Sequence, residues 1–231
     1  MKLLALDTSS LACSVALQVG DDIVEQYEEQ PREHTRLLLP MVRSILEQSG
    51  VGLNDLDAII LGNGPGSFIG MRIAASVAQG LAHGAGLNIV PVSSMAAVAA
   101  EVLVESEADI VLVSQDAHMN EVYLGGYERD QNGLPAEIFP ERLQGQDAIV
   151  ELSKDSNKRR VAAGSGWQRY PALLEKNRAG FDAVSECLNP RARFLLGLGA
   201  QDLKAGLSVV PAEITPAYLR QKVAEKPAPM P

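Results

Sequence analysis

The sequence predicts an α/β protein built from two similar halves, and three observations carry this prediction. Apolar segments of strand length alternate with amphipathic segments of helix length along the chain. The order strand, acid, hairpin, helix, strand, helix occurs twice, with Asp7 and Asp116 in equivalent places. The apolar share of 46% and the charged share of 21% are those of a globular protein with a buried core.

The first half begins with three strands and a helix. Leu3–Leu6 is wholly apolar and ends at Asp7, so it predicts a buried strand. Cys13–Val19 and Ile23–Glu29 flank a turn of the Gly-Asp-Asp type and predict a hairpin. In His34–Gln48 the apolar residues share one side of a helix, and the glycine that follows is a typical helix end.

The rest of this half repeats strand and helix. Ala58–Leu61 is a short apolar strand that leads into a glycine-rich loop at residues 62–70. The spacing then predicts a helix at Ile69–Ala85, a strand at Ile89–Val92 and a helix at Ser93–Val104.

The second half follows the same plan. Its predicted strands are Ile110–Ser114, Glu121–Glu128, Leu134–Pro140 and Val161–Ala163, and its predicted helices are Asp147–Leu152 and Arg191–Ala205. The predicted domains are residues 1–106 and 107–226, with a flexible tail at 227–231. Two such units facing each other across a cleft are typical of the actin-like ATPase (ASKHA) architecture, built from duplicated ribonuclease-H-like domains. A single Rossmann-like domain with an appendage is the alternative.

Composition excludes several classes of function. A net charge of −9 repels phosphate backbones, so tight direct binding of nucleic acid is disfavoured. Cys13 and Cys187 stand far apart in apolar surroundings, which suits free thiols in a reducing cytoplasm. No apolar run reaches the length of about 18 residues that a membrane span needs.

Local spacing indicates no metal or nucleophile site. His34, His83, His118 and the two cysteines stand at none of the spacings that metal ligands use. Ser67 follows a glycine, but the nucleophile elbow also needs glycine at the position that Ile69 occupies.

The loop containing Gly64 and Gly66 allows two interpretations. Its backbone amides lie between a strand and a helix, where they could hold an anion or a nucleotide. The plainer interpretation is a tight turn that lets helix and strand pack closely. Binding of NAD is disfavoured, because no acid for the ribose occurs between Asp57 and Glu101.

Asp7 and Asp116 allow two interpretations as well. In actin-like ATPases the equivalent acids hold magnesium and the attacking water, which makes an ATPase or kinase one function hypothesis. The plainer interpretation is that each carboxylate caps a turn. No glycine-rich phosphate hairpin follows Asp7, so independent nucleotide hydrolysis is disfavoured.

Four stretches of the sequence resemble the TsaB (YeaZ) family, whose members help make threonylcarbamoyladenosine in bacterial tRNA. These stretches are Leu4–Ser9, Gly64–Arg72, Asp116–Tyr123 and Pro216–Arg220. Two positions depart from the family pattern, since Ile69 stands where threonine is common and His118 where arginine is common.

The resemblance implies a non-catalytic role. TsaB proteins are relatives of the catalytic subunit TsaD, which holds its metal through a histidine pair of the form HxxxH. The places of those histidines fall on Ser94 and Val98, and valine cannot bind a metal. The same two positions disfavour the metal-dependent peptidase that the older glycoprotease-like label implies.

The resemblance also implies partners. The expected partners are a TsaD-type catalytic subunit, a TsaE-type ATPase and a second copy of the chain, with tRNA reached indirectly through the complex. No cofactor is required, and whether ATP or ADP lies at a subunit junction stays open. The helix Ile69–Ala85 is apolar nearly all round, so it is either interior or part of an interface together with the helix His34–Gln48. The candidate interface residues are Leu38, Val42, Ile45, Ile73, Val77, Ala78 and Leu81.

Overall fold

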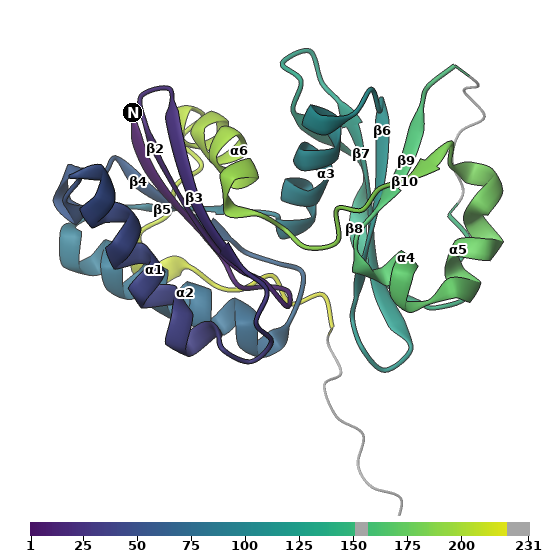
Figure 1. The fold of residues 1–231 in the computed structure, drawn as a ribbon, viewed down its shortest axis with the longest axis horizontal. Coiled ribbons are helices and arrows are strands. Elements are labelled where there is room, and N and C mark those ends of the chain that lie inside the picture. Colours follow the sequence, from purple (N-terminus) through teal and green to yellow (C-terminus); the bar gives the residue numbers. More distant parts are fainter. Residues whose placement is uncertain (151–156, 221–231) are drawn as a thin grey trace, which may run out of the picture.

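The computed structural model describes residues 1–150 and 157–220, and these form two five-stranded sheets with helices on their faces (Figure 1). The first sheet has the strand order β3-β2-β1-β4-β5 and the second the order β10-β9-β6-β7-β8. The strands of the first sheet are β1 (Lys2–Asp7), β2 (Cys13–Val19), β3 (Asp22–Glu28), β4 (Ala58–Gly62) and β5 (Ile89–Val92). Those of the second are β6 (Ile110–Asp116), β7 (Glu121–Arg129), β8 (Pro135–Gly145), β9 (Arg160–Ala163) and β10 (Ala183–Val184).

The central strand of each sheet ends in an aspartate. β1 pairs antiparallel with β2, which sets Asp7 opposite Ser14, and parallel with β4. β6 pairs antiparallel with β7, which sets Asp116 opposite Val122, and parallel with β9. The same pairing pattern in both halves confirms the predicted architecture of two ribonuclease-H-like units.

Helices cover both faces of each sheet, and two of them lie between the sheets (Figure 1). The helices are α1 (His34–Ser49), α2 (Phe68–Ala85), α3 (Ser94–Glu105), α4 (Ser165–Arg169), α5 (Pro171–Asn177) and α6 (Ala192–Lys204), with single turns at Leu53–Asp55, Arg178–Gly180 and Pro211–Glu213. Among the helices of the described residues, none has the length and apolar character needed to cross a membrane.

The two inner helices each pack on the sheet of the other half of the sequence. α3 follows the last strand of the first sheet, yet its Val98 and Val102 pack with Val111 and Val113 of β6. α6 lies near the C-terminus, yet its Leu195 packs on the first sheet. The predicted domain 107–226 therefore does not describe the packing, because α6 belongs with the first sheet. The predicted tail, 227–231, lies outside the described residues.

The predicted helix Asp147–Leu152 is wrong over the residues that are described. Residues 146–150 form a turn followed by irregular chain, and 151–152 lie outside the described part. The amide of Val150 donates to Asn177 Oδ1 at 2.7 Å, so a side chain from α5 replaces the helical partner. Two short helices, α4 and α5, were not predicted.

Candidate functional site

The carboxylate of Asp7 is enclosed by protein at the end of β1. Oδ1 accepts hydrogen bonds from the amide and the hydroxyl of Ser9, at 2.7 and 2.8 Å, and Oδ2 accepts one from the Ser94 hydroxyl at 2.6 Å. A Cβ at Gly62 would lie 1.9 Å from Oδ2, so β4 packs directly against this oxygen. Burial raises the pKa of Asp7, and the hydrogen bonds from Ser94 and Ser9 oppose that increase.

The two positions matched to metal-binding histidines have other structural roles. The Ser94 hydroxyl donates to Asp7 and accepts from the amide of Gly64 at 3.0 Å, so it joins two loops of the first half. Val98 is fully buried in an apolar cluster with Met95.

The glycine-rich loop packs tightly against the turn after β1. A Cβ at Gly66 would lie 2.2 Å from the carbonyl oxygen of Ser9, and one at Gly70 would lie 1.9 Å from that of Thr8. The Thr8 hydroxyl donates to the carbonyl of Gly70 at 2.7 Å. Only glycine permits this approach, which is the close packing that the plainer interpretation predicts.

Two amides at the start of α2, those of Ser67 and Gly70, have partners inside the protein. The amide of Ser67 donates to the Ser9 carbonyl at 2.6 Å, and the amide of Gly70 donates to the Ser67 hydroxyl at 3.2 Å. Gly64 has a left-handed φ of +84°, and a Cβ there would meet the Met71 sulfur at 2.1 Å. The anion site predicted at Gly64 and Gly66 stays a prediction, since these contacts use the loop for packing.

Asp116 has a more open environment than Asp7. Its Oδ1 accepts hydrogen bonds from the Tyr170 hydroxyl at 3.0 Å and from the His118 amide at 2.8 Å. Its side chain is 19% exposed and its Oδ2 lies 3.2 Å from His118 Nδ1. The two acids predicted to share magnesium thus bond to different residues, and only Asp116 keeps appreciable contact with solvent.

The last of the four stretches that carry the family resemblance contacts two of the others. Arg72 Nε of α2 donates to the Tyr218 hydroxyl at 2.8 Å, and Arg220 Nη2 donates to the carbonyl of Ala117 at 2.8 Å. The segment 215–220 therefore contacts the glycine-rich region of the first half and the loop after β6 of the second. No spacing along the sequence indicated this contact.

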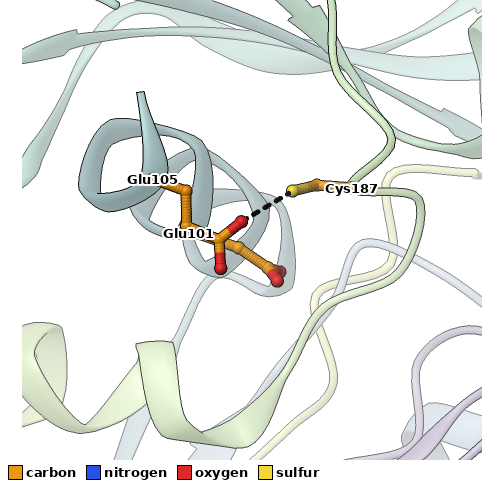
Figure 2. Close-up of side chains that lie close together, drawn as sticks. All are labelled: Glu101, Glu105 and Cys187. Atoms are coloured by element: carbon orange, nitrogen blue, oxygen red, sulfur yellow. Dashed lines mark hydrogen bonds between the residues drawn. The ribbon is translucent and has the colours of Figure 1, made fainter. Parts of the chain in front are cut away.

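A cluster of three possible metal ligands lies on α3 and the loop facing it. Glu101 and Glu105 are one helical turn apart, and Cys187 faces them from the chain that leads to α6 (Figure 2). Their ligand atoms lie within 4.8 Å of one another, beside a cavity of about 460 Å³ that Arg159 and Arg191 also line. The helical spacing of the two glutamates is the only sequence signal for this cluster, which was not predicted.

The charges around this cluster make it a poor metal site. Burial raises the pKa of Glu101 to about 7, which the guanidinium of Arg191 opposes, with Nη1 3.4 Å from Oε1. Burial also raises the pKa of the Cys187 thiol to about 11, so the thiol keeps its proton at neutral pH. A bound cation would have to displace that proton and lie close to Arg191.

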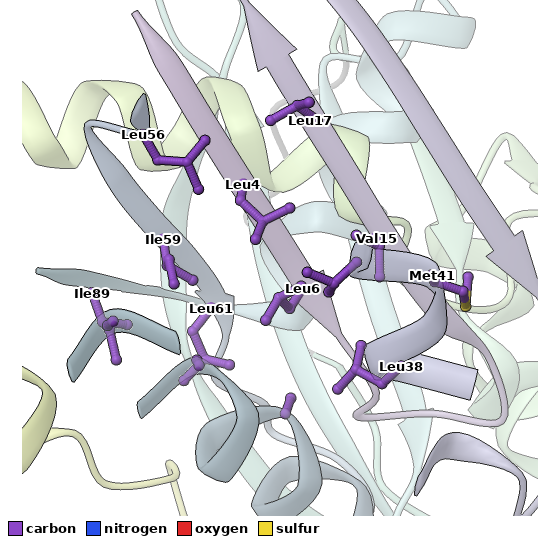
Figure 3. Packing of buried hydrophobic residues seen from close by; sticks show 14 of the residues in the cluster. Leu4, Leu6, Val15, Leu17, Leu38, Met41, Leu56, Ile59, Leu61 and Ile89 are labelled. Carbon is purple, nitrogen blue, oxygen red and sulfur yellow. The ribbon is translucent and has the colours of Figure 1, made fainter. Parts of the chain in front are cut away.

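Four of the predicted interface residues are buried by the chain itself, and their place in an interface stays a prediction. Leu38, Val42 and Ile45 form the apolar side of α1 and pack on the first sheet, and Ala78 of α2 is fully buried. Figure 3 shows Leu38 and Met41 of α1 in the same apolar cluster as Leu6 and Val15 of the sheet.

The exposed surface of these two helices contains a groove between α1 and α2, which we name the α1/α2 groove. Its volume is about 450 Å³, and its lining residues are Thr35, Leu38, Ile69, Arg72, Ile73, Ser76 and Val77. Ile73 and Val77, which were predicted for the interface, are partly exposed there, as is the predicted Leu81 further along α2. Ile69, which lines the groove, is 69% exposed, so this face presents a large apolar side chain to solvent.

Comparison with known proteins gives matches over most of the chain. A family model described as TsaD, tRNA N6-adenosine threonylcarbamoyltransferase, matches residues 23–177. The chain is 38% identical over 229 residues to the tRNA threonylcarbamoyladenosine biosynthesis protein TsaB of Escherichia coli strain K12, covering 99% of both proteins. It is 37% identical to the protein of the same name from Haemophilus influenzae, covering 99% of this chain and 98% of that one.

A solved structure with a similar fold is described as YeaZ from Pseudomonas aeruginosa. It has 38% sequence identity and a TM-score of 0.87, and the match covers 94% of this chain and 99% of that one. A second structure, described as an uncharacterized protein with similarity to peptidase YEAZ from Pseudomonas aeruginosa, has 37% identity and a TM-score of 0.88, with 95% and 99% coverage. The similarity thus extends over both halves of the chain.

Proposed function

This chain belongs to the TsaB (YeaZ) family of tRNA threonylcarbamoyladenosine biosynthesis proteins, and we propose that within that pathway it is a non-catalytic partner of a TsaD-type transferase subunit. The observation that carries this proposal is the use of Ser94 and Val98. The first ties Asp7 to Gly64, and the second lies in the apolar core. Neither side chain is placed to do the work of the catalytic subunit's histidines.

The enclosed state of Asp7 supports the same proposal over an ATPase or kinase. A carboxylate that serves magnesium needs free oxygens, because this ion takes oxygen ligands together with water. Both oxygens of Asp7 instead accept hydrogen bonds from the chain itself, and the residue is 1% exposed. Asp7 is better explained as a structural acid.

The proposed contact surface for the partner is the α1/α2 groove. Its apolar lining and the exposed Ile69 at its edge are features of protein interfaces, whose centres are poor in charge. The TsaD-type subunit binds this groove, and a second copy of the chain occupies it when that subunit is absent. A TsaE-type ATPase and tRNA join through the complex in the cytoplasm, and this chain supplies no cofactor of its own.

The decisive experiment is an omission assay. The purified TsaD-type partner, the other pathway proteins, ATP and unmodified tRNA are incubated with and without this chain, and threonylcarbamoyl transfer to adenosine is measured. We expect transfer to fall to background without the chain and to return when it is added. Full transfer in its absence would contradict the proposal. Nucleotide turnover by the chain alone, abolished in Asp7→Ala, would favour the ATPase instead.

A further inference from the structure

The segment Thr215–Arg220 is anchored on the first half of the protein by backbone and side-chain contacts. The side-chain amide of Asn63 donates to the carbonyl of Thr215 at 3.0 Å, and the amide of Ala217 donates to the Asn63 carbonyl at 3.2 Å. Ile214, directly before the segment, is buried in the core of the first half. The start of the segment is therefore fixed to the loop that precedes α2.

Tyr218 extends this anchor onto the first turn of α2. Its ring centroid lies 5.4 Å from that of Phe68, and its hydroxyl accepts from Arg72 Nε at 2.8 Å. The guanidinium of Arg72 in turn lies 3.7 Å from the centre of the Phe68 ring. Stacking of this kind stabilises both partners. Since Arg72 and the adjacent Ile69 line the α1/α2 groove, Tyr218 supports one end of that groove.

Arg220 makes the corresponding contacts with the second half. Its Nη2 donates to the carbonyls of Ala117 at 2.8 Å and His118 at 3.4 Å, and its Nη1 lies 2.5 Å from Glu121 Oε2. A fourth contact joins Nη1 to the sulfur of Met119 at 3.5 Å. One guanidinium thus contacts four of the five residues at 117–121.

The backbone of that loop has an unfavourable conformation. His118, Met119 and Asn120 follow one another with φ values of +59°, +57° and +62°. Left-handed conformations are costly for residues with a Cβ, and consecutive ones persist only where the surroundings hold them. Arg220 binds two carbonyls at the start of this run, so it is suited to hold the loop in place.

We propose that residues 215–220 are a clasp that couples the loop at 117–121 to the α1/α2 groove. The clasp connects the two through Arg220 at one end and Tyr218 at the other. A change in the loop is transmitted to the first turn of α2, and occupation of the groove is transmitted back to the loop, because such coupling is reciprocal. This inference rests on the proposed function only in naming the groove as the partner's site.

The first test uses hydrogen–deuterium exchange on the free, full-length chain. In Arg220→Ala we expect amides of 117–121 to exchange about tenfold faster than in the wild type, and those of residues 68–72 to exchange faster as well. Arg36→Ala is the matched control, because the exposed side chain of Arg36 bonds to Glu33 and Gln30 rather than to the clasp. A change confined to 117–121 would show that Arg220 acts locally and would overturn the coupling.

The second test measures affinity for the TsaD-type partner. Arg220 does not itself line the groove, yet the clasp predicts that Arg220→Ala weakens binding of the partner roughly five- to twentyfold, within the usual range of coupling between sites. Arg220→Lys keeps the charge but loses the paired donors, and we expect only partial recovery. Unchanged affinity in Arg220→Ala would refute the coupling while leaving the partner role intact. Absence of binding by the wild type would refute the partner role, and the exchange experiment would still decide the clasp.

Discussion

At the scale of single residues, the carboxylate of Asp7 has a structural task that its equivalent, Asp116, does not share. Asp7 is 1% exposed and accepts hydrogen bonds from Ser9 and Ser94, whereas the side chain of Asp116 is 19% exposed. A buried acceptor is costly to remove, because its donors are left without partners. An acid at the surface can exchange its partners for water.

This difference predicts unequal effects of truncating the two acids. Asp7→Ala leaves the Ser94 hydroxyl and the Ser9 amide without their acceptor, so we expect a loss of about 2–4 kcal/mol in the free energy of unfolding. Asp116→Ala is the matched control and should lose about 1 kcal/mol or less. Urea denaturation followed by circular dichroism measures both values. Equal losses would contradict the structural role of Asp7.

Glu101 predicts a pH dependence of stability. Burial raises its pKa from 4.5 to about 7 in the folded protein, against the opposing charge of Arg191 and with a further raising effect of Glu105 and Glu25. Between these two values the unfolded chain has lost the proton and the folded protein keeps it. Stability from this group is therefore full below about pH 4.5, falls as the pH rises toward 7, and stays low above it.

The variant Glu101→Gln removes this dependence. Relative to the wild type, we expect the variant to gain about 1–3 kcal/mol between pH 4.5 and pH 8, measured by urea unfolding at each pH. Glu107→Gln, at an exposed position just beyond α3, serves as the control and should follow the wild-type profile. A difference between wild type and Glu101→Gln that does not change with pH would refute the prediction.

Residue roles were predictable from the sequence only where residue type decides them. Valine at position 98 excludes a metal ligand whatever the fold. The bond from Ser94 to Asp7 was not predictable, because the two residues are 87 positions apart and meet only when β1 and the start of α3 are in place. Cys187 and Glu105 are 82 positions apart, and their contact was not predictable for the same reason.

At the scale of helices and strands, the period of apolar residues predicted the long elements closely. α1 begins at the predicted His34, and Gly50 ends it with a left-handed φ of +61°. α4 and α5 have only five and seven residues, which is too short for a helical period to show. The period of apolar residues does not predict what each apolar helix face packs against. The apolar side of α1, predicted as an interface, packs on its own sheet.

The two faces of α2 therefore predict two different mutant phenotypes. Ala78 is fully buried, so Ala78→Glu should cost at least about 4 kcal/mol and unfold much of the protein. Ile69 is 69% exposed in the first turn of α2, where a negative charge suits the helix dipole, so Ile69→Glu should leave thermal stability within a few degrees of the wild type.

The affinity of surface variants for the TsaD-type partner tests whether the groove is the surface that binds it. We expect Ile69→Glu to weaken that binding at least about tenfold, by placing a charge in an apolar contact. Val104→Glu is the matched control, since Val104 is 70% exposed on α3 and does not line the groove. Equal affinity in both variants would contradict the proposal that the partner binds the α1/α2 groove.

At the scale of the whole molecule, the chain passes twice between the sheets, and the sequence could predict two units without predicting which helices complete them. α3 leaves the first sheet and packs with Val111 and Val113 of the second, while α6 returns to cover Leu3 and Ile60 of the first. The repeat in the sequence marks the strands well. It does not predict which helix covers which sheet, because α3 and α6 both have apolar sides that could pack on either sheet.

This exchange of helices predicts how the protein can be divided. A fragment of residues 1–106 keeps the first sheet but lacks α6, and it carries α3 without the sheet on which α3 packs. Two apolar surfaces are then exposed, so we expect no cooperative unfolding transition, strong binding of a hydrophobic dye and a tendency to aggregate.

A different division should restore folding. A chain that joins residues 1–92 to 188–218 through a flexible linker holds the first sheet, α1, α2 and α6, and it omits α3. It also keeps the bridge between Ile89 and Val209 at the edge of β5 and the buried Ile214. We expect this chain to unfold cooperatively in urea and to show a dispersed NMR spectrum, although it is shorter in its N-terminal part than the failing fragment. Cooperative unfolding of residues 1–106 alone would contradict this prediction, because it would mean that the first sheet folds without α6.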